Sequence, residues 1–242
     1  MKFTIKLADK SIQVDGHSPK LREFFSDYLF DTENPELQFS WTEQEILSEQ
    51  NSLESDFPVS YLETLAALRK IAEAFPLHNR LLIHGASIAY NGKGYLFTAP
   101  SGTGKSTHIK LWREHLGSDV KIINGDKPFL SLDGDVPRIY GSPWAGKENW
   151  HRNCNFPLDG ICIVQRGLQN IIRRLNPAES LTMLFHQIYI PTDPISAGAT
   201  LDLADKLLKA VPVYLLECDI SEDAVRCSFE AMTGLTYPSD IS

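Results

Sequence analysis

The stretch GKGYLFTAPSGTGKST, residues 92–107, decides the fold of this chain. Its first half, up to Thr98, is short, aromatic and β-prone, which predicts a strand. From Ala99 onward the spacing matches a Walker A pattern, with alanine in the first place and Gly-Lys-Ser at the end. An amphipathic run then begins at Lys105 and stops at Gly117, which predicts a helix. Strand, glycine-rich loop and helix in this order predict a phosphate-binding loop.

The predicted loop has the groups that a polyphosphate needs. Backbone N–H groups of a glycine-rich turn point into one concavity, and the N-terminus of the following helix adds its positive end. Lys105 is expected to contact the β- and γ-phosphates, and Ser106 to offer its hydroxyl to Mg²⁺. The predicted ligands are therefore ATP and Mg²⁺. The expected nucleotide-binding residues are Ser101, Gly102, Thr103, Gly104, Lys105, Ser106 and Thr107.

Composition and charge narrow the class of protein. The 242 residues are 43% hydrophobic, which is enough for a sizeable core in one or two domains. The formal charge of −8 argues against a nucleic-acid or membrane partner, because both favour a basic surface. The four cysteines have no metal-ligand or redox spacing, and the N-terminus alternates without an apolar leader segment. We therefore expect a cytoplasmic protein with reduced thiols.

Residues 1–76 predict a small α+β region without a functional motif. The expected elements are a hairpin over 2–14, a helix over 21–29, a strand over 37–41 and a helix over 61–75. The acidic, polar segment 43–56 predicts an exposed connection. Ser60 and Glu63 have the spacing of a capping box at the start of the last helix. We expect this region to help recognise a partner.

Residues 77–242 predict the nucleotide-binding domain. The expected strands cover 81–83, 88–90, 95–98, 120–123, 161–164 and 213–216, with a hairpin over 129–139. The expected helices cover 105–116, 178–189, 201–210 and 222–232. Asp126 follows a strand that comes after the Walker A helix, where the second Mg²⁺ ligand is expected. The loop 141–147, GSPWAGK, is too rich in glycine and proline to form an element and is expected to cover a ligand.

These motifs resemble those of bacterial HPr kinase-like proteins, which belong to the phosphoenolpyruvate carboxykinase-like P-loop superfamily. The resemblance rests on the Walker A through His108, on His84-Gly85 before it, and on GDKP (125–128) and loop 141–147 after it. It extends from His84 to about the Cys218 region. It implies an α/β fold in which a mixed, curled sheet surrounds the loop and helices pack largely on one side.

The resemblance also implies roles for individual residues. Such kinases have a His-Gly before the Walker A, which corresponds to His84, and two acidic residues after the next strand, which correspond to Gly125 and Asp126. Only the second acid is present, so the proton acceptor is either Asp126 or His84. Catalytic roles fall on Asp126, His84 and Lys105, metal ligation on Ser106 and Asp126, and a homo-oligomer is implied. The C-terminal signature of true HPr kinase/phosphorylases is missing, so HPr is not the predicted substrate.

Several further side chains are weaker candidates. Lys147 and Arg152 flank the Gly/Pro-rich loop and either neutralise transition-state charge or are simply solvated. Trp144 stacks on a base, covers the acceptor or anchors its loop. Three arginines after a buried strand are candidates for nucleotide or acceptor contacts: Arg166, Arg173 and Arg174.

The predicted function is that of an ATP-dependent phosphotransferase, a kinase that moves the γ-phosphate to a hydroxyl. The acceptor is expected to be Ser or Thr of a peptide or protein, or a small molecule. The alternative is a nucleotide-binding sensor or scaffold without transfer, which the glycine at Gly125 favours. Restored activity in Gly125→Asp would then indicate a decayed kinase. A plain NTPase is the third possibility.

Overall fold

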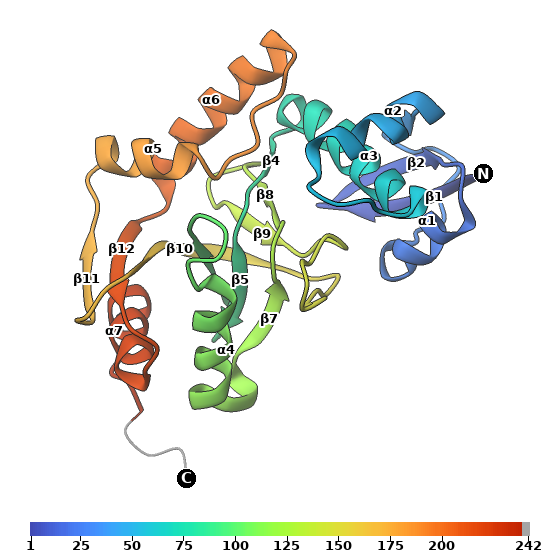
Figure 1. Cartoon of the computed structure of the whole chain (residues 1–242). Coiled ribbons are helices and arrows are strands. Elements are labelled where there is room, and N and C mark those ends of the chain that lie inside the picture. Colours follow the sequence, from blue (N-terminus) through green and yellow to red (C-terminus); the bar gives the residue numbers. More distant parts are fainter. Residues whose placement is uncertain (239–242) are drawn as a thin grey trace.

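Two β-sheets organise the chain in the computed structural model, which describes residues 1–238 (Figure 1). The smaller sheet has the strand order β1-β2-β3. Its strands are β1 (Lys2–Leu7), β2 (Lys10–Asp15) and β3 (Leu37–Ser40). The antiparallel pairing of β1 with β2 matches the predicted hairpin, and β3 runs parallel to β2. The turn of the hairpin uses two left-handed residues, Ala8 and Asp9, at φ 48° and 62°.

The helices of the N-terminal region differ from the prediction. The helix expected over 21–29 is shorter, because α1 (Pro19–Phe24) gives way to a 3₁₀ turn. The prediction of an exposed connection over 43–56 is wrong, since helix α2 (Glu43–Ser48) lies there. The Thr42 hydroxyl accepts a hydrogen bond from the Glu45 N–H, and the Glu45 carboxylate accepts one in return from the Thr42 N–H. An acidic composition therefore hid a capped helix.

The prediction of a capping box at Ser60 and Glu63 is also wrong. Helix α3 (Val59–Ala74) begins two residues earlier than predicted and has no side-chain cap. Glu63 is only 1% exposed, and its carboxylate accepts hydrogen bonds from the backbone N–H groups of residues 17–18 and from the Trp41 indole. A buried carboxylate needs such donors. Glu63 therefore joins α3 to segments distant in the sequence.

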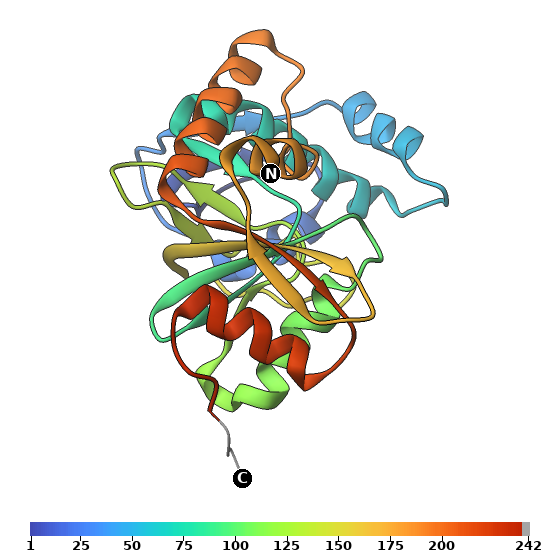
Figure 2. The ribbon, with the colours of Figure 1, turned by 90° about the vertical axis from the view of Figure 1, so that its left-hand side faces the viewer.

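The larger sheet is mixed, as predicted, and strand β10 is common to both of its halves (Figure 2). The first residues of β10 pair antiparallel with β9, and its later residues lie parallel to β6 and β12. The register shifts between Leu158 and Gly160. The strands are β4 (Arg80–Leu82), β5 (Ala86–Tyr90), β6 (Lys93–Thr98), β7 (Lys121–Asn124), β8 (Phe129–Ser131), β9 (Arg138–Tyr140), β10 (Asn155–Arg166), β11 (Ile171–Arg174) and β12 (Val213–Cys218). Strand β11 is absent from the sequence-based prediction.

Helices lie on both faces of this sheet, which corrects the expectation of helices on one side (Figure 2). The alternation of side chains along β6 shows the two faces: Phe97 packs in the core under α4 and α7, and Leu96 in the core under α5 and α6. Helix α6 begins well before the predicted residue 201, because Asp193 caps it. The helices are α4 (Lys105–Leu116), α5 (Pro177–Phe185), α6 (Pro194–Ala210) and α7 (Glu222–Thr233).

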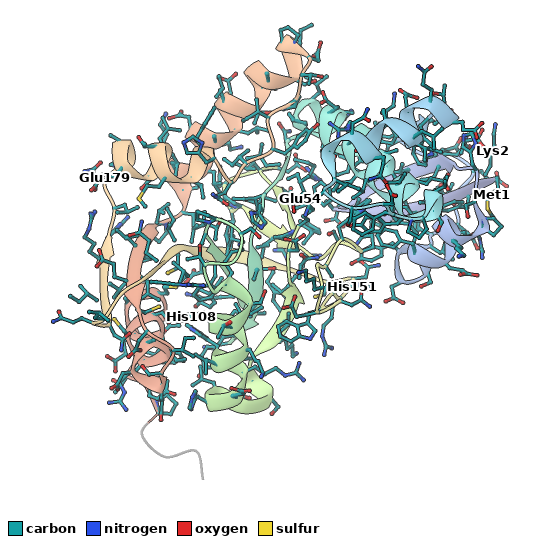
Figure 3. The ribbon with its side chains drawn as sticks, viewed as in Figure 1. Met1, Lys2, Glu54, His108, His151 and Glu179 are labelled. Atoms are coloured by element: carbon teal, nitrogen blue, oxygen red, sulfur yellow. The ribbon has the colours of Figure 1, made fainter. Side chains whose placement is uncertain are left out.

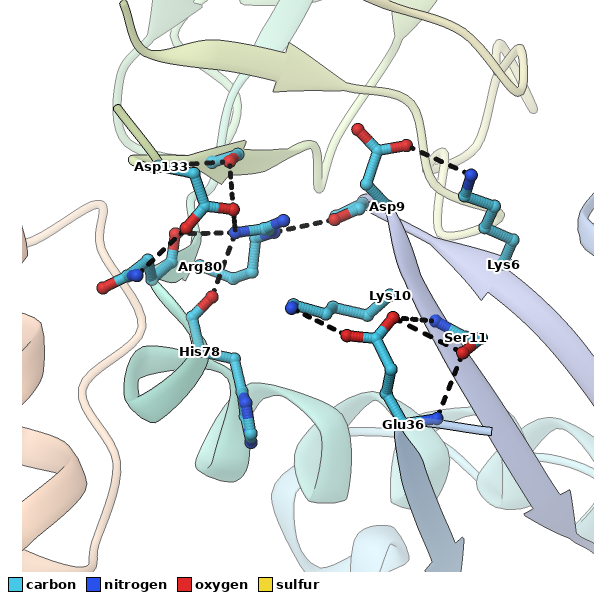
Figure 4. Close-up of polar contacts among 11 residues, drawn as sticks. Lys6, Asp9, Lys10, Ser11, Glu36, His78, Arg80 and Asp133 are labelled. Atoms are coloured by element: carbon cyan, nitrogen blue, oxygen red, sulfur yellow. Dashed lines mark hydrogen bonds and ion pairs between the residues drawn. The ribbon is translucent and has the colours of Figure 1, made fainter. Parts of the chain in front are cut away.

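A buried polar contact and a shared core fix the N-terminal region against the larger sheet. Arg80 is 2% exposed, and its guanidinium donates to the Ala8 carbonyl at 2.7 Å and to the Asp133 carboxylate at 2.5 Å (Figure 4). Phe25 and Trp144, from the two sides of the junction, belong to one hydrophobic core. The predicted boundary after residue 76 falls within a 3₁₀ turn and stays a prediction. No helix in residues 1–238 has both the length and the apolar character needed to cross a membrane.

Burial of His108 predicts a loss of stability in mild acid. The ring is 3% exposed between α4 and α7, where Nε2 lies 2.9 Å from Ser228 Oγ (Figure 3). Burial lowers the pKa of His108 to about 4. The unfolded chain protonates histidine at about pH 6.5, so below that pH it binds a proton that the folded chain does not, and stability falls until the folded pKa is reached.

We expect wild-type protein to lose about 2 kcal/mol more unfolding free energy than His108→Gln between about pH 7 and about pH 5. Urea unfolding at the two pH values measures this difference. His186→Gln, which changes an exposed histidine, serves as the control and should follow the wild type. Equal losses in wild type and His108→Gln would show that His108 is not the group responsible.

Candidate functional site

The loop between β6 and α4 has the backbone conformation that glycine allows. Gly102 and Gly104 have φ values of 76° and 127°, and an added Cβ would meet no atom within 4 Å at either position. Glycine is therefore needed for conformation and not for space. Helix α4 has no side-chain cap at its start, so its first N–H groups are available to an anion.

Lys105 lies against the loop that precedes it. Its ammonium donates hydrogen bonds to the carbonyls of Ala99 at 2.9 Å and Pro100 at 3.4 Å, and the side chain is 7% exposed. Burial lowers the pKa of Lys105, and the nearby Asp126 carboxylate acts in the opposite direction. Phosphate oxygens are stronger acceptors than carbonyl oxygens, so this buried ammonium is suited to bind phosphate.

Arg166, at the end of β10, contacts the glycine-rich loop but does not line the cavity. Its guanidinium donates to the Gly102 carbonyl at 2.5 Å and to the Thr103 carbonyl at 3.1 Å. Both contacts are to backbone carbonyls, so Arg166 stabilises the conformation of the loop. Among the candidate arginines of the sequence, Arg166 is the one that touches the loop in the described part of the chain.

His84 and Asp126 face each other across the sheet end. His84 Nε2 lies 3.3 Å from Asp126 Oδ1, and Nδ1 lies 3.2 Å from Gln187 Oε1. The backbone carbonyl of Gln187 also accepts from the His84 N–H at 2.7 Å. The Gln187 oxygen favours a proton on Nδ1, whereas the Asp126 carboxylate favours a proton on Nε2, which then donates to it. No sequence pattern indicates a role for Gln187, which lies far from His84 along the chain.

The surroundings of Asp126 favour its ionised carboxylate. Burial raises the pKa of this carboxyl, but the hydrogen bond with His84 and the positive charge of Lys127 outweigh it and lower the pKa to about 2. Lys127 Nζ lies 2.5 Å from Asp126 Oδ2. A carboxylate that resists protonation is better suited to bind a cation than to take a proton. Lys127 is a second residue that the sequence-based prediction missed.

A buried asparagine joins the acidic loop to the Gly/Pro-rich loop. Asn124 is fully buried, and its side-chain oxygen accepts from the N–H groups of Asp126 at 2.8 Å and Lys127 at 2.7 Å. Its side-chain nitrogen donates to the carbonyls of Ser142 at 2.8 Å and Trp144 at 3.4 Å. The two loops, far apart in sequence, are therefore one structural unit.

The backbone around Gly125 leaves no room for the acid that the resemblance leads one to expect. A Cβ at Gly125 would lie 2.7 Å from the Ala145 carbonyl oxygen, which is closer than side chains approach a backbone. The Gly125 N–H is also bonded to the Trp150 carbonyl at 2.8 Å. Gly146 approaches closely too, because its added Cβ would lie 3.1 Å from the Asp126 Cβ. Packing therefore requires glycine at Gly125.

One cavity of about 860 Å³ contains most of the predicted site. The predicted site residues that line it are His84, Ser101, Gly102, Gly104, Lys105, Ser106, Thr107 and Asp126, and Thr103 is the one that does not. Lys147 also lines it. The candidates Arg152, Arg166, Arg173 and Arg174 do not, and Arg173 instead forms an exposed ion pair with Glu179. Trp144 also lines the cavity, but it is only 6% exposed and donates a hydrogen bond to the Thr64 carbonyl at 2.9 Å. It therefore anchors its loop.

The donor set fits a metal ion that arrives with a nucleotide. Within residues 1–238 no group of three or more His, Cys, Asp or Glu side chains has the arrangement to hold a metal ion. Mg²⁺ bound to phosphates needs only one or two protein oxygens, because phosphates and water complete its shell. Ser106 and Asp126 line the same cavity and offer these two oxygens.

Comparison with solved structures finds a distant structural neighbour. No family model matches the chain, and no curated protein matches it. The HPr(Ser) kinase/phosphatase from Coxiella burnetii aligns with 13% identity and a TM-score of 0.36, over 63% of this chain and 99% of that chain. A TM-score this low carries no argument about family or activity. The HPr kinase-like resemblance of the motifs therefore stays a prediction.

We expect Gly125→Asp to lower stability by about 1–3 kcal/mol instead of restoring a second acid, because its Cβ displaces the Ala145 backbone. Thermal unfolding followed by circular dichroism measures the loss. Gly198→Ala, in helix α6 with no atom within 4 Å of the added Cβ, is the matched control and should be neutral or slightly stabilising. A Gly125→Asp protein as stable as the wild type would contradict the packing described here.

Proposed function

We propose that this protein is an ATP-dependent phosphotransferase with the phosphoenolpyruvate carboxykinase-like P-loop fold of the HPr kinase-like proteins. One observation carries the proposal: the glycine-rich loop with Lys105 and the Asp126–His84 pair line the same cavity. The first set of groups suits a triphosphate, and the second suits a metal ion and a proton. A surface turn with a chance Walker A spacing would have no such pair facing it.

The proposed reaction is transfer of the γ-phosphoryl group to a hydroxyl. The acceptor oxygen forms a bond to the γ-phosphorus while the bond to the β-phosphate oxygen breaks and ADP leaves. The acceptor proton passes to His84 Nε2 in the tautomer that has its own proton on Nδ1, bonded to the Gln187 side-chain oxygen. The backbone N–H groups of 101–107 and the Lys105 ammonium stabilise charge on the phosphate oxygens, which supplies most of the acceleration in such reactions.

Asp126 and His84 take separate roles in this proposal. Ser106 and Asp126 would hold Mg²⁺, which neutralises charge on the β- and γ-phosphates when bound. The low pKa of Asp126, about 2, makes its carboxylate a weak proton acceptor, and His84 is the group next to it. The proposal thereby assigns to His84 the proton transfer for which related kinases use a second acid. Lys127, which pairs with Asp126 Oδ2 in this structure, would then be available to contact the phosphates.

The proposed acceptor is Ser or Thr of a peptide or protein.

The formal charge of −8 and the missing redox or metal spacing of the cysteines favour a cytoplasmic protein without a nucleic-acid or membrane partner. A homo-oligomer, which the resemblance implies, is part of the same proposal.

A second candidate function is nucleotide binding without transfer. The observation that favours it is the ion pair between Lys127 and the single carboxylate of Asp126, next to a glycine that packing fixes. A protein of this kind would bind Mg-ATP and form no ADP, even with acceptor peptides present. Sensing or scaffolding would then depend on the loop alone.

We expect Lys105→Ala to lower transfer from γ-labelled ATP to serine peptides by about 100-fold or more, because a preorganised cation at the phosphates is lost. Label on the peptide and ADP formation are the two readouts. Lys110→Ala is the matched control, since this lysine lies on the exposed side of α4 in an ion pair with Glu114. Unchanged turnover in Lys105→Ala would contradict the proposed mechanism, and ATP binding without ADP formation in the wild type would favour the second candidate.

A further inference from the structure

The cavity combines two kinds of chemistry. Residues of the loop 101–107 line it with groups suited to phosphate, and the N-terminal region adds aromatic side chains to the same lining. We name these side chains the aromatic wall: Phe24, Phe57 and Tyr61. None of them belongs to the groups that the proposed phosphoryl transfer uses.

The aromatic wall presents apolar surface to the cavity instead of burying it. Phe57 is 38% exposed and Tyr61 is 43% exposed, and their rings stack at a centroid distance of 4.8 Å. The Gln50 side chain holds this segment, because its oxygen accepts from the Phe57 N–H at 3.1 Å and its nitrogen donates to the Ser55 carbonyl at 2.8 Å. Stacked, fixed and exposed aromatic rings are typical of a surface that binds a partner.

A chain of contacts connects the aromatic wall to the loop that contains Asp126. Asn124 holds the acidic loop and donates to the Trp144 carbonyl. The Trp144 indole in turn donates to the Thr64 carbonyl of α3, one turn beyond Tyr61. The Trp144 ring also packs edge-on against Phe24 at a centroid distance of 5.6 Å. The aromatic wall and the Asp126 loop therefore have a fixed position relative to each other.

This position favours the acceptor over the nucleobase as the occupant. In phosphoryl transfer the attacking and leaving oxygens lie roughly in line, on opposite sides of the γ-phosphorus. The acceptor therefore approaches from the side of His84 and Asp126, and ADP with its base lies on the other side. The contacts described above connect the aromatic wall to the Asp126 loop, so we assign it to the acceptor side.

We propose that the aromatic wall binds a large apolar side chain adjacent to the Ser or Thr that accepts the phosphate. The inference rests on the proposed kinase function. A polypeptide is the expected occupant, because the exposed apolar surface continues along the chain from Phe57 to Val59, which is 54% exposed, beyond what a small molecule requires. The N-terminal region thus selects the acceptor.

The test uses short blocked peptides that each contain one central serine. The peptides differ only in the residue next to this serine, which is Phe, Leu, Gly or Asp. Calorimetry measures their affinity for the full chain in the presence of Mg²⁺ and a non-hydrolysable ATP analogue. We expect the Phe peptide to bind about 10- to 100-fold tighter than the Gly peptide. In the double variant Phe57→Ala/Tyr61→Ala the preference should largely disappear, with analogue affinity unchanged. Leu168→Ala, which alters a fully exposed residue outside the cavity lining, should behave as wild type.

Equal binding of the Phe and Gly peptides, or no binding of any peptide, overturns the inference. Loss of analogue affinity in the double variant also overturns it and assigns the aromatic wall to the nucleobase. A transfer assay with the same peptides separates the two proposals. Preferential binding without label on the serine supports the aromatic wall and contradicts the kinase, whereas label without any preference supports the kinase and contradicts the aromatic wall.

Discussion

The buried amide of Asn124 is the interaction on which the rest of the site depends. Its oxygen fixes the backbone that carries Asp126, and its nitrogen fixes the loop that carries Trp144. Trp144 is in turn bonded to helix α3, so one side chain connects the acid, the covering loop and the N-terminal region. Loss of this amide would leave several buried donors and acceptors unpaired, each at a cost of about 1–3 kcal/mol. The cavity is thus shaped by one polar network inside the protein.

The same network explains why this chain has Gly125 at the first of the two positions where the resemblance implies acids. The loop held by Asn124 brings the Ala145 carbonyl to within 2.7 Å of a Cβ at Gly125. A second carboxylate and this close packing exclude each other. With one carboxylate present, His84 and Lys127 are the groups that face it, and Gln187 orients the His84 ring. A histidine paired with one acid therefore stands where the resemblance implies an acid pair.

Local patterns predicted the parts of the fold that local interactions determine. The strand, loop and helix around Lys105, the strands β5 and β6, and helix α7 all lie where the sequence indicated. Their signals are turn residues, caps and periodicity within a few residues. Most predicted site residues share one cavity for the same reason, because the strand ends that carry them meet at the loop.

The features that the sequence did not reveal depend on contacts between distant segments. Glu63 has the spacing of a local cap, but its partners are the backbone of residues 17–18 and Trp41. Gln187 and His84 meet only through the fold, and Trp144 is an anchor because Thr64 lies beside it. A composition rule also failed at α2, where a capped helix replaces the expected exposed connection. Periodicity within one segment carries no information about such partners.

The most direct measurement is a calorimetric titration of ATP, with and without Mg²⁺, into wild type, Asp126→Asn and His84→Asn. If Asp126 holds the metal and His84 accepts the proton, Mg²⁺ should strengthen ATP binding in wild type and His84→Asn but much less in Asp126→Asn. If Mg²⁺ strengthens binding equally in all three proteins, Asp126 is not a metal ligand. If ATP does not bind the wild type at all, the nucleotide site proposed at the glycine-rich loop is wrong.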